Sequence, residues 1–196
     1  LAGFAAEADV PVINGLTRRS HPCQIMADLM TVEERLGRID GRTIAWVGDG
    51  NNVAATFLEA ARHLDFALRV ATPPELALPQ AVVAEARAAG ADITVGNDAA
   101  AAVDGADVVV ADAWASMGDE DEERRRTLLG PFQVNDALMA AAAPTAVFLH
   151  CLPAHRNEEV TDAVIDGPQS AVFDEAENRV HAQKAVLKYV FGLLDV

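Results

Sequence analysis

Positively charged residues are scarce in this sequence. Its 196 residues include 15 Lys and Arg but 30 Asp and Glu, which gives a formal net charge of −15. Proteins bind nucleic acids largely through Lys and Arg side chains that displace counterions from the phosphates, so this balance argues against a nucleic-acid partner. A hydrophobic content of 51% also rules out an acidic disordered tail and supplies enough apolar side chains for a core.

Cysteines and long apolar runs are also few. Cys23 and Cys151 are the two cysteines, too few for the disulfide framework of a secreted domain, so we expect reduced thiols. No apolar run reaches the roughly 18 residues that cross a membrane, and no signal-peptide pattern stands near the start. We therefore expect a soluble, cytoplasmic protein without a membrane partner. Metal-ligand spacings such as C-x-x-C do not occur, and no metal is expected.

Apolar segments of strand length alternate with segments of helical period. Strands are predicted at residues 43–47, 66–71, 92–95, 107–111, 146–149 and 170–173, and helices at 51–63, 79–89, 135–142 and 175–194. Residues 108–110 are three consecutive valines, as expected for a strand that is covered on both faces. The alternation predicts an α/β fold: a doubly wound parallel sheet with flanking helices in a Rossmann-like three-layer arrangement.

The first forty residues break this rhythm. Residues 9–14 resemble a strand and residues 21–36 a long helix. Asp40-Gly41 then marks a break before the regular pattern begins. A strand without a partner before a long helix suggests the remnant of a second α/β domain. The last predicted helix is apolar on more than one face, so it needs a surface outside the main domain.

The loop after residues 43–47 reads Gly48-Asp49-Gly50-Asn51-Asn52 and opens a helix. Val53 stands where a dinucleotide-binding loop has its third glycine, and no acidic residue follows the strand at 66–71. A nicotinamide cofactor is therefore disfavoured. The loop is either a tight turn with an Asn cap or a site where Asn side chains and free helix N–H groups hold a carboxylate.

Three further loops carry polar groups at the ends of predicted strands, where ligands bind in this fold. Asp112 follows the strand at 107–111, where it could hold an ammonium group or cap a turn. Cys151 follows the strand at 146–149 beside a histidine, either as a buried structural cysteine or as part of a Cys/His pair. Arg179 lies in the first turns of a predicted helix, where the helix dipole favours anionic side chains. A cation at this position suggests that it faces an anionic ligand. The charged run at 119–126 is interpreted as a solvated loop.

These loops together resemble the ornithine carbamoyltransferases. The resemblance covers nearly the whole chain and depends on five motifs in the same order and spacing: His21-Pro22-Cys23-Gln24, Gly48-Asp49-Gly50-Asn51-Asn52, Asp112 with Ser116-Met117-Gly118, His150-Cys151-Leu152-Pro153 and Ala176-Glu177-Asn178-Arg179. The first motif indicates only the wider aspartate/ornithine transcarbamylase superfamily. Ser-Met-Gly together with His-Cys-Leu-Pro narrows it to the ornithine enzymes.

The resemblance implies transfer of the carbamoyl group from carbamoyl phosphate to the δ-amine of L-ornithine, a step of arginine biosynthesis that gives L-citrulline and phosphate. By similarity, His21 and Gln24 contact the carbamoyl group, and His21 donates to the oxygen that gains charge. The backbone carbonyl of Leu152 contacts the carbamoyl nitrogen. Arg179 faces carbamoyl phosphate.

The ornithine side of the site is implied in the same way. Asn52 holds the α-carboxylate with help from the backbone near Met117, and Asp112 and Ser116 hold the α-ammonium. Cys151 lies near the reacting amine. That amine is mostly protonated at neutral pH and must lose its proton before it attacks, so the Cys151 and Asp112 pair is a candidate acceptor, although the sequence does not decide which group takes the proton. No cofactor is implied, because carbamoyl phosphate is already activated.

Two departures from the family pattern stand out. Ala55-Thr56 replaces a His-Ser pair, and the Ser-Thr-Arg-Thr phosphate loop of the family is absent. The resemblance therefore implies that residues 1–31 are the end of a carbamoyl phosphate domain and its bridging helix, 32–180 the ornithine domain, and 181–196 a helix that returns to the missing domain. The chain alone is expected to be inactive, and the full-length protein to be a homotrimer. An amino-acid-binding module without catalysis, or a transcarbamylase for another amine, remains an alternative.

Overall fold

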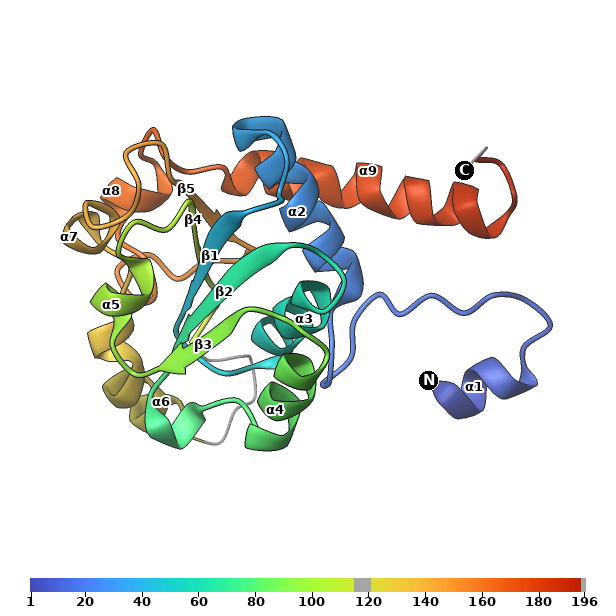
Figure 1. Cartoon of the computed structure of the whole chain (residues 1–196), viewed down its shortest axis with the longest axis horizontal. Coiled ribbons are helices and arrows are strands. Elements are labelled where there is room, and N and C mark those ends of the chain that lie inside the picture. Colours follow the sequence, from blue (N-terminus) through green and yellow to red (C-terminus); the bar gives the residue numbers. More distant parts are fainter. Residues whose placement is uncertain (115–120, 195–196) are drawn as a thin grey trace.

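The centre of the molecule is a five-stranded parallel sheet (Figure 1). The computed structural model describes residues 1–114 and 121–194. The strands are β1 (Arg42–Val47), β2 (Phe66–Ala71), β3 (Ile93–Gly96), β4 (Val108–Ala111) and β5 (Val147–His150). They lie in the order β3-β2-β1-β4-β5, so the chain changes direction across the sheet between β1 and β4. The predicted α/β fold is confirmed, and a crevice is expected beyond the carboxyl ends of β1 and β4.

The register brings the carboxyl ends of the central strands level with one another. Trp46 pairs with Val110 across β1 and β4, and Ala111 pairs with His150 across β4 and β5. Asp112 and Cys151 directly follow that last pair, so both leave the sheet at the same edge as neighbours. The pairing of the strands thus sets where these two side chains can meet.

Helices cover both faces of this sheet. They are α1 (Ala2–Glu7), α2 (Pro22–Leu36), α3 (Asn52–Ala61), α4 (Gln80–Ala88), α5 (Ala99–Val103), α6 (Glu122–Leu129), α7 (Asp136–Met139), α8 (Asp162–Ile165) and α9 (Val172–Val190), with 3-10 turns η1 (Pro74–Leu76) and η2 (Gly130–Phe132). Side chains of α2, α3 and α4 pack on one face of the sheet, and those of α5, α7 and α8 pack on the other. The result is the predicted arrangement of three layers.

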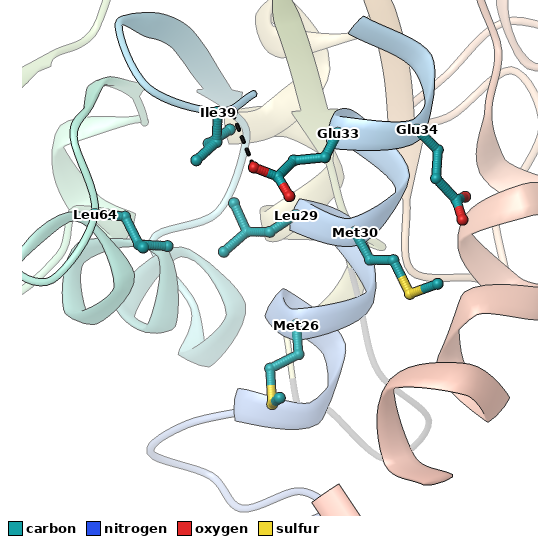
Figure 2. A pocket seen from close by; sticks show the side chains of 7 residues that line it. All are labelled: Met26, Leu29, Met30, Glu33, Glu34, Ile39 and Leu64. Carbon is teal, nitrogen blue, oxygen red and sulfur yellow. Dashed lines mark hydrogen bonds between the residues drawn. The ribbon is translucent and has the colours of Figure 1, made fainter. Parts of the chain in front are cut away.

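The outer side of α2 bears a groove of about 510 Å³ (Figure 2). It is lined by Met26, Leu29, Met30, Glu33, Glu34, Ile39 and Leu64. Glu33 accepts a hydrogen bond from the backbone N–H of Ile39 at one end of the groove, over 3.2 Å. The lining combines apolar side chains with two carboxylates and contains no cationic group, so it does not suit an anionic substrate.

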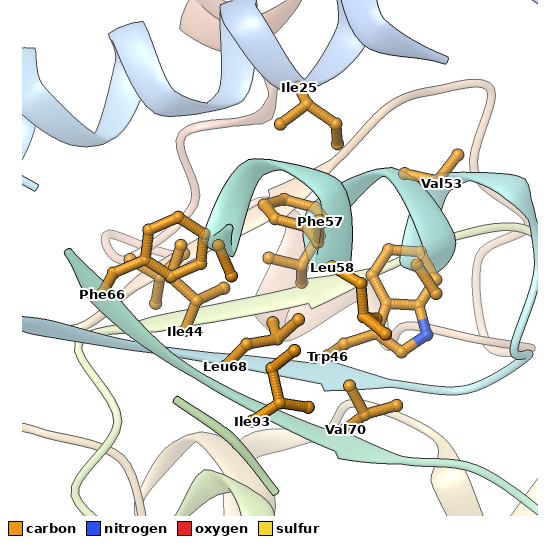
Figure 3. Close-up of a cluster of buried hydrophobic side chains, with 14 of the residues drawn as sticks. Ile25, Ile44, Trp46, Val53, Phe57, Leu58, Phe66, Leu68, Val70 and Ile93 are labelled. Carbon is orange, nitrogen blue, oxygen red and sulfur yellow. The ribbon is translucent and has the colours of Figure 1, made fainter. Parts of the chain in front are cut away.

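Alternate residues of β1 enter two separate cores, as the two-residue period of a strand requires. Ile44 and Trp46 point toward α3, and Figure 3 shows Trp46 beneath that helix near Phe57. The rings of Trp46 and Phe57 have centroids 6.0 Å apart. The Trp46 indole N–H donates to the backbone oxygen of Asp49 over 2.9 Å, so the same buried side chain also holds the loop that follows its strand.

The predicted strand at 9–14 does not form. Residues 8–20 contain no helix or strand, and α1 precedes them. Val10 and Ile13 are exposed, and within the described residues no strand lies beside this segment to accept its backbone hydrogen bonds. An extended segment without a neighbouring strand cannot become part of a sheet.

The predicted strand at 170–173 is reduced to a single bridge, in which Ser170 pairs with Phe148. Helix α9 already begins at Val172, and Asp174 in its first turn complements the helix dipole. The predicted helix at 135–142 also proves shorter, because α7 ends at Met139. Its cap is as expected: the side-chain oxygen of Asn135 accepts the N–H of Leu138 over 3.0 Å.

The far half of α9 extends beyond the rest of the domain (Figure 1). Its exposed apolar side chains are Val180, Leu187 and Tyr189, followed by Phe191 and Leu193 just after the helix. The N-terminal segment also exposes large apolar side chains, namely Leu1, Phe4, Val10, Ile13 and Leu16. Within the described residues, no helix combines the length and hydrophobicity needed to cross a membrane.

Candidate functional site

Asp112 and Cys151 meet at the carboxyl edge of the sheet. The Cys151 thiol donates to Asp112 Oδ1 over 2.9 Å, and the backbone N–H of Ala113 donates to the same oxygen over 2.8 Å. The second oxygen, Oδ2, accepts a hydrogen bond from Asn51 over 2.7 Å. The two side chains predicted to lie near the reacting amine are therefore in direct contact, and the Asp112 carboxylate is held at both oxygens.

Asn51 is a site residue that the sequence analysis did not assign. Its Oδ1 accepts the backbone N–H groups of Val53 and Ala54 and so caps α3, while its Nδ2 donates to Asp112. One side chain therefore both starts the helix after β1 and orients the carboxylate after β4. Its N-cap position was visible in the sequence, but the contact with Asp112 depends on the order of the strands.

The glycine before this cap is required by close packing. A Cβ on Gly50 would lie 2.5 Å from the backbone oxygen of Leu76, and the Gly50 N–H already donates to that oxygen over 2.9 Å. Any side chain here would displace the turn at η1. The Gly-x-Gly of this loop thus serves a close approach of two backbone segments.

The Cys151 thiol is protonated in this setting. Burial raises its pKa, and the neighbouring Asp112 carboxylate raises it further. Only the thiolate is a strong nucleophile, so these surroundings oppose covalent catalysis by Cys151. The Cys/His pair considered from the sequence is not an activated nucleophile.

His150 does not activate Cys151, because both of its ring nitrogens are engaged in other hydrogen bonds. Its Nδ1 accepts the backbone N–H of Leu152 over 3.0 Å, which leaves the ring proton on Nε2 to face Glu159 Oε1 at 3.2 Å. Both side chains are completely buried. Leu152 has a positive φ of 52°, an uncommon conformation for a residue with a side chain. The buried His150 and Glu159 pair therefore holds the backbone at the residue whose carbonyl was predicted to contact substrate.

His21 lies at the start of α2 and is nearly buried. Its backbone N–H donates to Thr56 Oγ1 over 2.8 Å, so one member of the Ala55-Thr56 pair that replaces the usual His-Ser supports His21. Burial lowers the pKa of His21, and the positive charge of Arg179 lowers it further, so the ring is neutral. Its Nδ1 is buried and has no hydrogen-bond partner among the described residues.

Gln24 and Arg179 are also brought together. An Arg179 guanidinium N–H donates to Gln24 Oε1 between α9 and α2. The Gln24 amide group donates to Asp28 over 2.7 Å and to Glu175 over 2.8 Å. Gln24, Asp28 and Glu175 are buried and Arg179 is half-buried. Together they form a cluster next to His21, in which Asp28 and Glu175 had no predicted role.

Asn52 takes a different direction from Asn51. Its Nδ2 donates to the backbone oxygen of Thr17 over 2.9 Å and so ties the first turn of α3 to the N-terminal segment. Ser116 and Met117, the other predicted contacts for the α-amino and α-carboxylate groups, lie outside the described residues.

Part of the charged run at 119–126 is ordered, contrary to the expectation of a solvated loop. Residues 122–126 belong to α6, and Arg125 in that helix donates to the backbone oxygen of Trp114 over 2.6 Å. It also pairs with Asp49 at 2.5 Å. The helix forms because its acidic first turn and basic last turn complement the helix dipole.

The polar atoms of Asp112, His150 and Cys151 lie within 4.8 Å of one another, which is close enough to consider a metal. The thiol and Asp112 are already joined by a hydrogen bond, and both His150 ring nitrogens have partners within the protein. A metal ion would have to break these contacts, so the arrangement favours a hydrogen-bonding site. The groove on α2 contains none of the predicted site residues.

Comparison with known families matches two adjacent parts of the chain. Residues 40–190 match the family described as "Aspartate/ornithine carbamoyltransferase, Asp/Orn binding domain". Residues 1–34 match "Aspartate/ornithine carbamoyltransferase, carbamoyl-P binding domain".

Individual relatives are similar over almost the whole chain. An ornithine carbamoyltransferase of Rhodopseudomonas palustris strain BisA53 is 62% identical over 192 residues, which cover 98% of this chain and 62% of the relative. The solved structure of the ornithine carbamoyltransferase from Pyrococcus furiosus aligns with a TM-score of 0.92 at 49% identity, covering 99% of this chain and 64% of that one. That from Campylobacter jejuni, called anabolic, has a TM-score of 0.90 at 32% identity, covering 98% of this chain and 66% of that one. The chain spans less than two thirds of the length of these relatives.

Proposed function

The chain belongs to the aspartate/ornithine carbamoyltransferase family, and we propose that the full-length protein transfers a carbamoyl group from carbamoyl phosphate to L-ornithine. In this reaction the δ-amine nitrogen bonds to the carbonyl carbon, the carbon–oxygen bond to phosphate breaks, and the amine loses a proton. The products are L-citrulline and phosphate. The observation that carries the proposal is the Asp112 carboxylate, held by Asn51 and Cys151 at the crevice beside the neutral ring of His21.

The carbamoyl side of the proposed site comprises His21, Gln24, Leu152 and Arg179. A neutral imidazole can donate its ring N–H to the carbonyl oxygen as that oxygen gains negative charge. Such a donor accelerates the chemical step because its hydrogen bond strengthens in the transition state. Arg179 supplies positive charge toward the phosphate in an acidic chain. The other cations that the family uses for phosphate belong to the part of the relatives that this chain does not span.

The ornithine side comprises Asn52, Asp112, Ser116, Met117 and Cys151. We propose that Asp112 and Ser116 bind the α-ammonium, and that Asn52 binds the α-carboxylate together with the backbone near Met117. Because the Cys151 thiol is protonated and its hydrogen is donated to Asp112, it cannot accept the amine proton in that state. The reactive ornithine is therefore the form with a neutral δ-amine, or one whose proton passes to a group other than Cys151.

We also propose the division of the chain and the assembly of the full-length protein. Residues 1–31 would complete a carbamoyl phosphate domain, 32–180 would form the ornithine domain, and 181–196 would return to the first domain. The exposed apolar side chains of the far half of α9 support a covering surface outside this chain. We expect the full-length protein to be a cytoplasmic homotrimer that acts in arginine biosynthesis, and sedimentation of the purified protein tests the trimer.

The decisive experiment measures citrulline formation by the full-length protein with carbamoyl phosphate and ornithine. Asp112→Asn should abolish most of the activity. An amide has no negative charge to pair with an ammonium group, and it has only one oxygen to accept hydrogen bonds. Asp136→Asn is the matched control, since this exposed carboxylate stands in α7, which precedes β5 at the opposite edge of the sheet. Normal turnover by Asp112→Asn, or no citrulline from the unaltered protein, would contradict the proposal.

A binding function without catalysis is the second candidate, because Asn51, Asp112 and Cys151 all belong to this chain. Calorimetry with ornithine on the 196-residue chain distinguishes the two functions. Binding by the chain, together with an inactive full-length protein, would favour the second candidate. Putrescine is the control ligand, because it lacks the α-amino and α-carboxylate groups.

A further inference from the structure

The carboxyl groups of Asp28 and Glu175 lie buried between α2 and α9, behind the proposed carbamoyl site. Each side chain belongs to a residue that is 1% exposed. Asp28 lies one turn after Gln24 on α2, and Glu175 lies in the first turn of α9. The mechanism proposed above gives neither residue a role.

The pair determines which way the Gln24 amide faces. Both hydrogens of Gln24 Nε2 are used, one toward Asp28 Oδ1 at 2.7 Å and one toward Glu175 Oε1 at 2.8 Å. The amide oxygen must then point to the other side, where it accepts from Arg179. An oxygen has two lone pairs, so Gln24 can still accept a hydrogen bond from a ligand but cannot donate one.

Glu175 also reaches the loop after β5. Its second oxygen, Oε2, accepts the backbone N–H of His150 over 2.8 Å. His150 immediately precedes Cys151 and Leu152. One carboxyl group therefore connects Gln24 on α2, the start of α9 and the end of β5, and each of these segments carries a predicted substrate contact.

Two carboxyl groups in contact inside a protein cannot both be ionised without strong repulsion. Burial raises the pKa of both, and the proximity of Asp28 raises that of Glu175 further, so Glu175 holds a proton at neutral pH. The other charged or titratable groups that face the pair are Arg179 from α9, Asp112 after β4 and Cys151 after β5. The only cation among them is Arg179.

Building on the proposed function, we propose that Asp28 and Glu175 form a proton-sharing carboxyl pair that positions the site by orienting the Gln24 amide and the start of the Cys151-Leu152 loop. They are positioning residues, since they touch Gln24 and His150 and not the substrate. The pair makes Gln24 an acceptor, which suits a substrate that presents an N–H group, such as the carbamoyl NH2.

Isosteric variants of the two acids have different consequences. In Asp28→Asn, the new amide oxygen still accepts from Gln24. Its NH2 group donates to Glu175 and so takes the place of the proton that the two acids share in the unaltered protein. In Glu175→Gln, one of the two oxygens becomes an NH2 group and faces a donor, either Gln24 Nε2 or the His150 N–H. A buried donor without an acceptor is costly, so only the second variant should disturb the site.

The test uses the full-length protein and compares Glu175→Gln, Asp28→Asn and Glu34→Gln. Glu34 also joins α2 to α9, through a 2.7 Å hydrogen bond from Asn178. It makes no hydrogen bond to a proposed site residue that the structure describes, so it serves as the control. Glu175→Gln should lower kcat/KM for carbamoyl phosphate by about tenfold or more. Asp28→Asn should lose clearly less, and Glu34→Gln should match the unaltered protein. Equal losses in the two acid variants, or none in Glu175→Gln, would overturn the proposal.

An infrared measurement tests the shared proton without relying on activity. The unaltered protein at neutral pH should show the carbonyl band of a protonated, buried carboxylic acid. The band should weaken or shift in Asp28→Asn and in Glu175→Gln and stay unchanged in Glu34→Gln. A protein that shows the band but makes no citrulline would refute the proposed function and leave the pair intact. A citrulline-forming protein without the band would refute the pair alone.

Discussion

Asn51 donates a hydrogen bond to the carboxylate of Asp112 over 2.7 Å, although the two residues are 61 positions apart in the chain. The contact spans the point where the strand order reverses, between β1 and β4. The cap of α3 and the acid proposed to bind ornithine are thereby combined in one hydrogen-bonded unit. The contribution of the hydrogen bond from Asn51 to Asp112 can be tested separately from that of the helix cap.

Asn51→Ser should weaken ornithine binding more than it weakens the fold. Serine is also a good N-cap, so α3 should be retained, but its short side chain cannot replace the donor to Asp112. We expect KM for ornithine in the full-length protein to rise about tenfold, a loss of about 1.4 kcal/mol, the order expected for a hydrogen bond to a charged group. Asn135→Ser, which alters the cap of α7 alone, is the control. An unchanged KM would show that Asp112 is held well enough by Cys151 and Ala113.

Cys151 should react slowly with alkylating reagents at neutral pH. Burial and the Asp112 carboxylate raise its pKa, so little thiolate is present. Mass spectrometry of the iodoacetamide-treated protein should show Cys151 modified far more slowly than a small free thiol in the same solution. Asp112→Asn should speed the reaction, because it removes the negative charge beside the sulfur. Rapid modification of the unaltered protein would contradict the assigned protonation state.

Removing Glu159 should destabilise the protein strongly. Glu159→Ala leaves the buried Nε2 proton of His150 and the partly buried backbone N–H of His155 without their acceptor. We expect a loss of about 3 kcal/mol in the free energy of unfolding, as is typical for breaking a buried polar pair. Glu158→Ala, next in sequence and partly exposed in a pair with Arg126, should cost at most about 1 kcal/mol. Urea denaturation measures the free energy of unfolding of both variants. Equal losses would show that the buried His150 and Glu159 pair contributes no more to stability than the exposed pair.

The buried pair should make stability depend on pH. Burial raises the pKa of Asp28 to about 7, whereas the unfolded chain has the ordinary value near 4. Between these values the folded protein holds more protons, so the free energy of unfolding should fall as the pH rises from about 4 to about 7, by at most ~4 kcal/mol. Asp28→Asn should flatten this part of the curve. Parallel pH profiles for the variant and the unaltered protein would contradict the raised pKa.

The five strands and their parallel arrangement were predictable because each is a short apolar run between helical segments. The errors lie where local pattern and tertiary surroundings disagree. Residues 9–14 have strand-like composition but no neighbouring strand in the described chain, so they remain irregular. Residues 170–173 contain the start of α9, because an acidic first turn favours the helix over a sixth strand.

The predicted site is partly brought together by the fold. Asp112 and Cys151 are in contact, as are Gln24 and Arg179, and each of these pairs comes from different elements. Asn52 contacts the N-terminal segment instead, and Ser116 and Met117 fall outside the described residues. Supporting residues such as Asn51 and Glu175 escaped prediction because what distinguishes them is a contact with a residue far away in the sequence.

The sequence alone determined the class of fold, the family resemblance and the loops that carry polar groups, because strand period, helix caps and short motifs are local properties. Only the tertiary structure decided that the Cys151 thiol is protonated, that Gln24 is an acceptor, and that Asp28 and Glu175 share a buried space. Burial and the distance between charges set these properties. Both arise when segments far apart in the chain pack together.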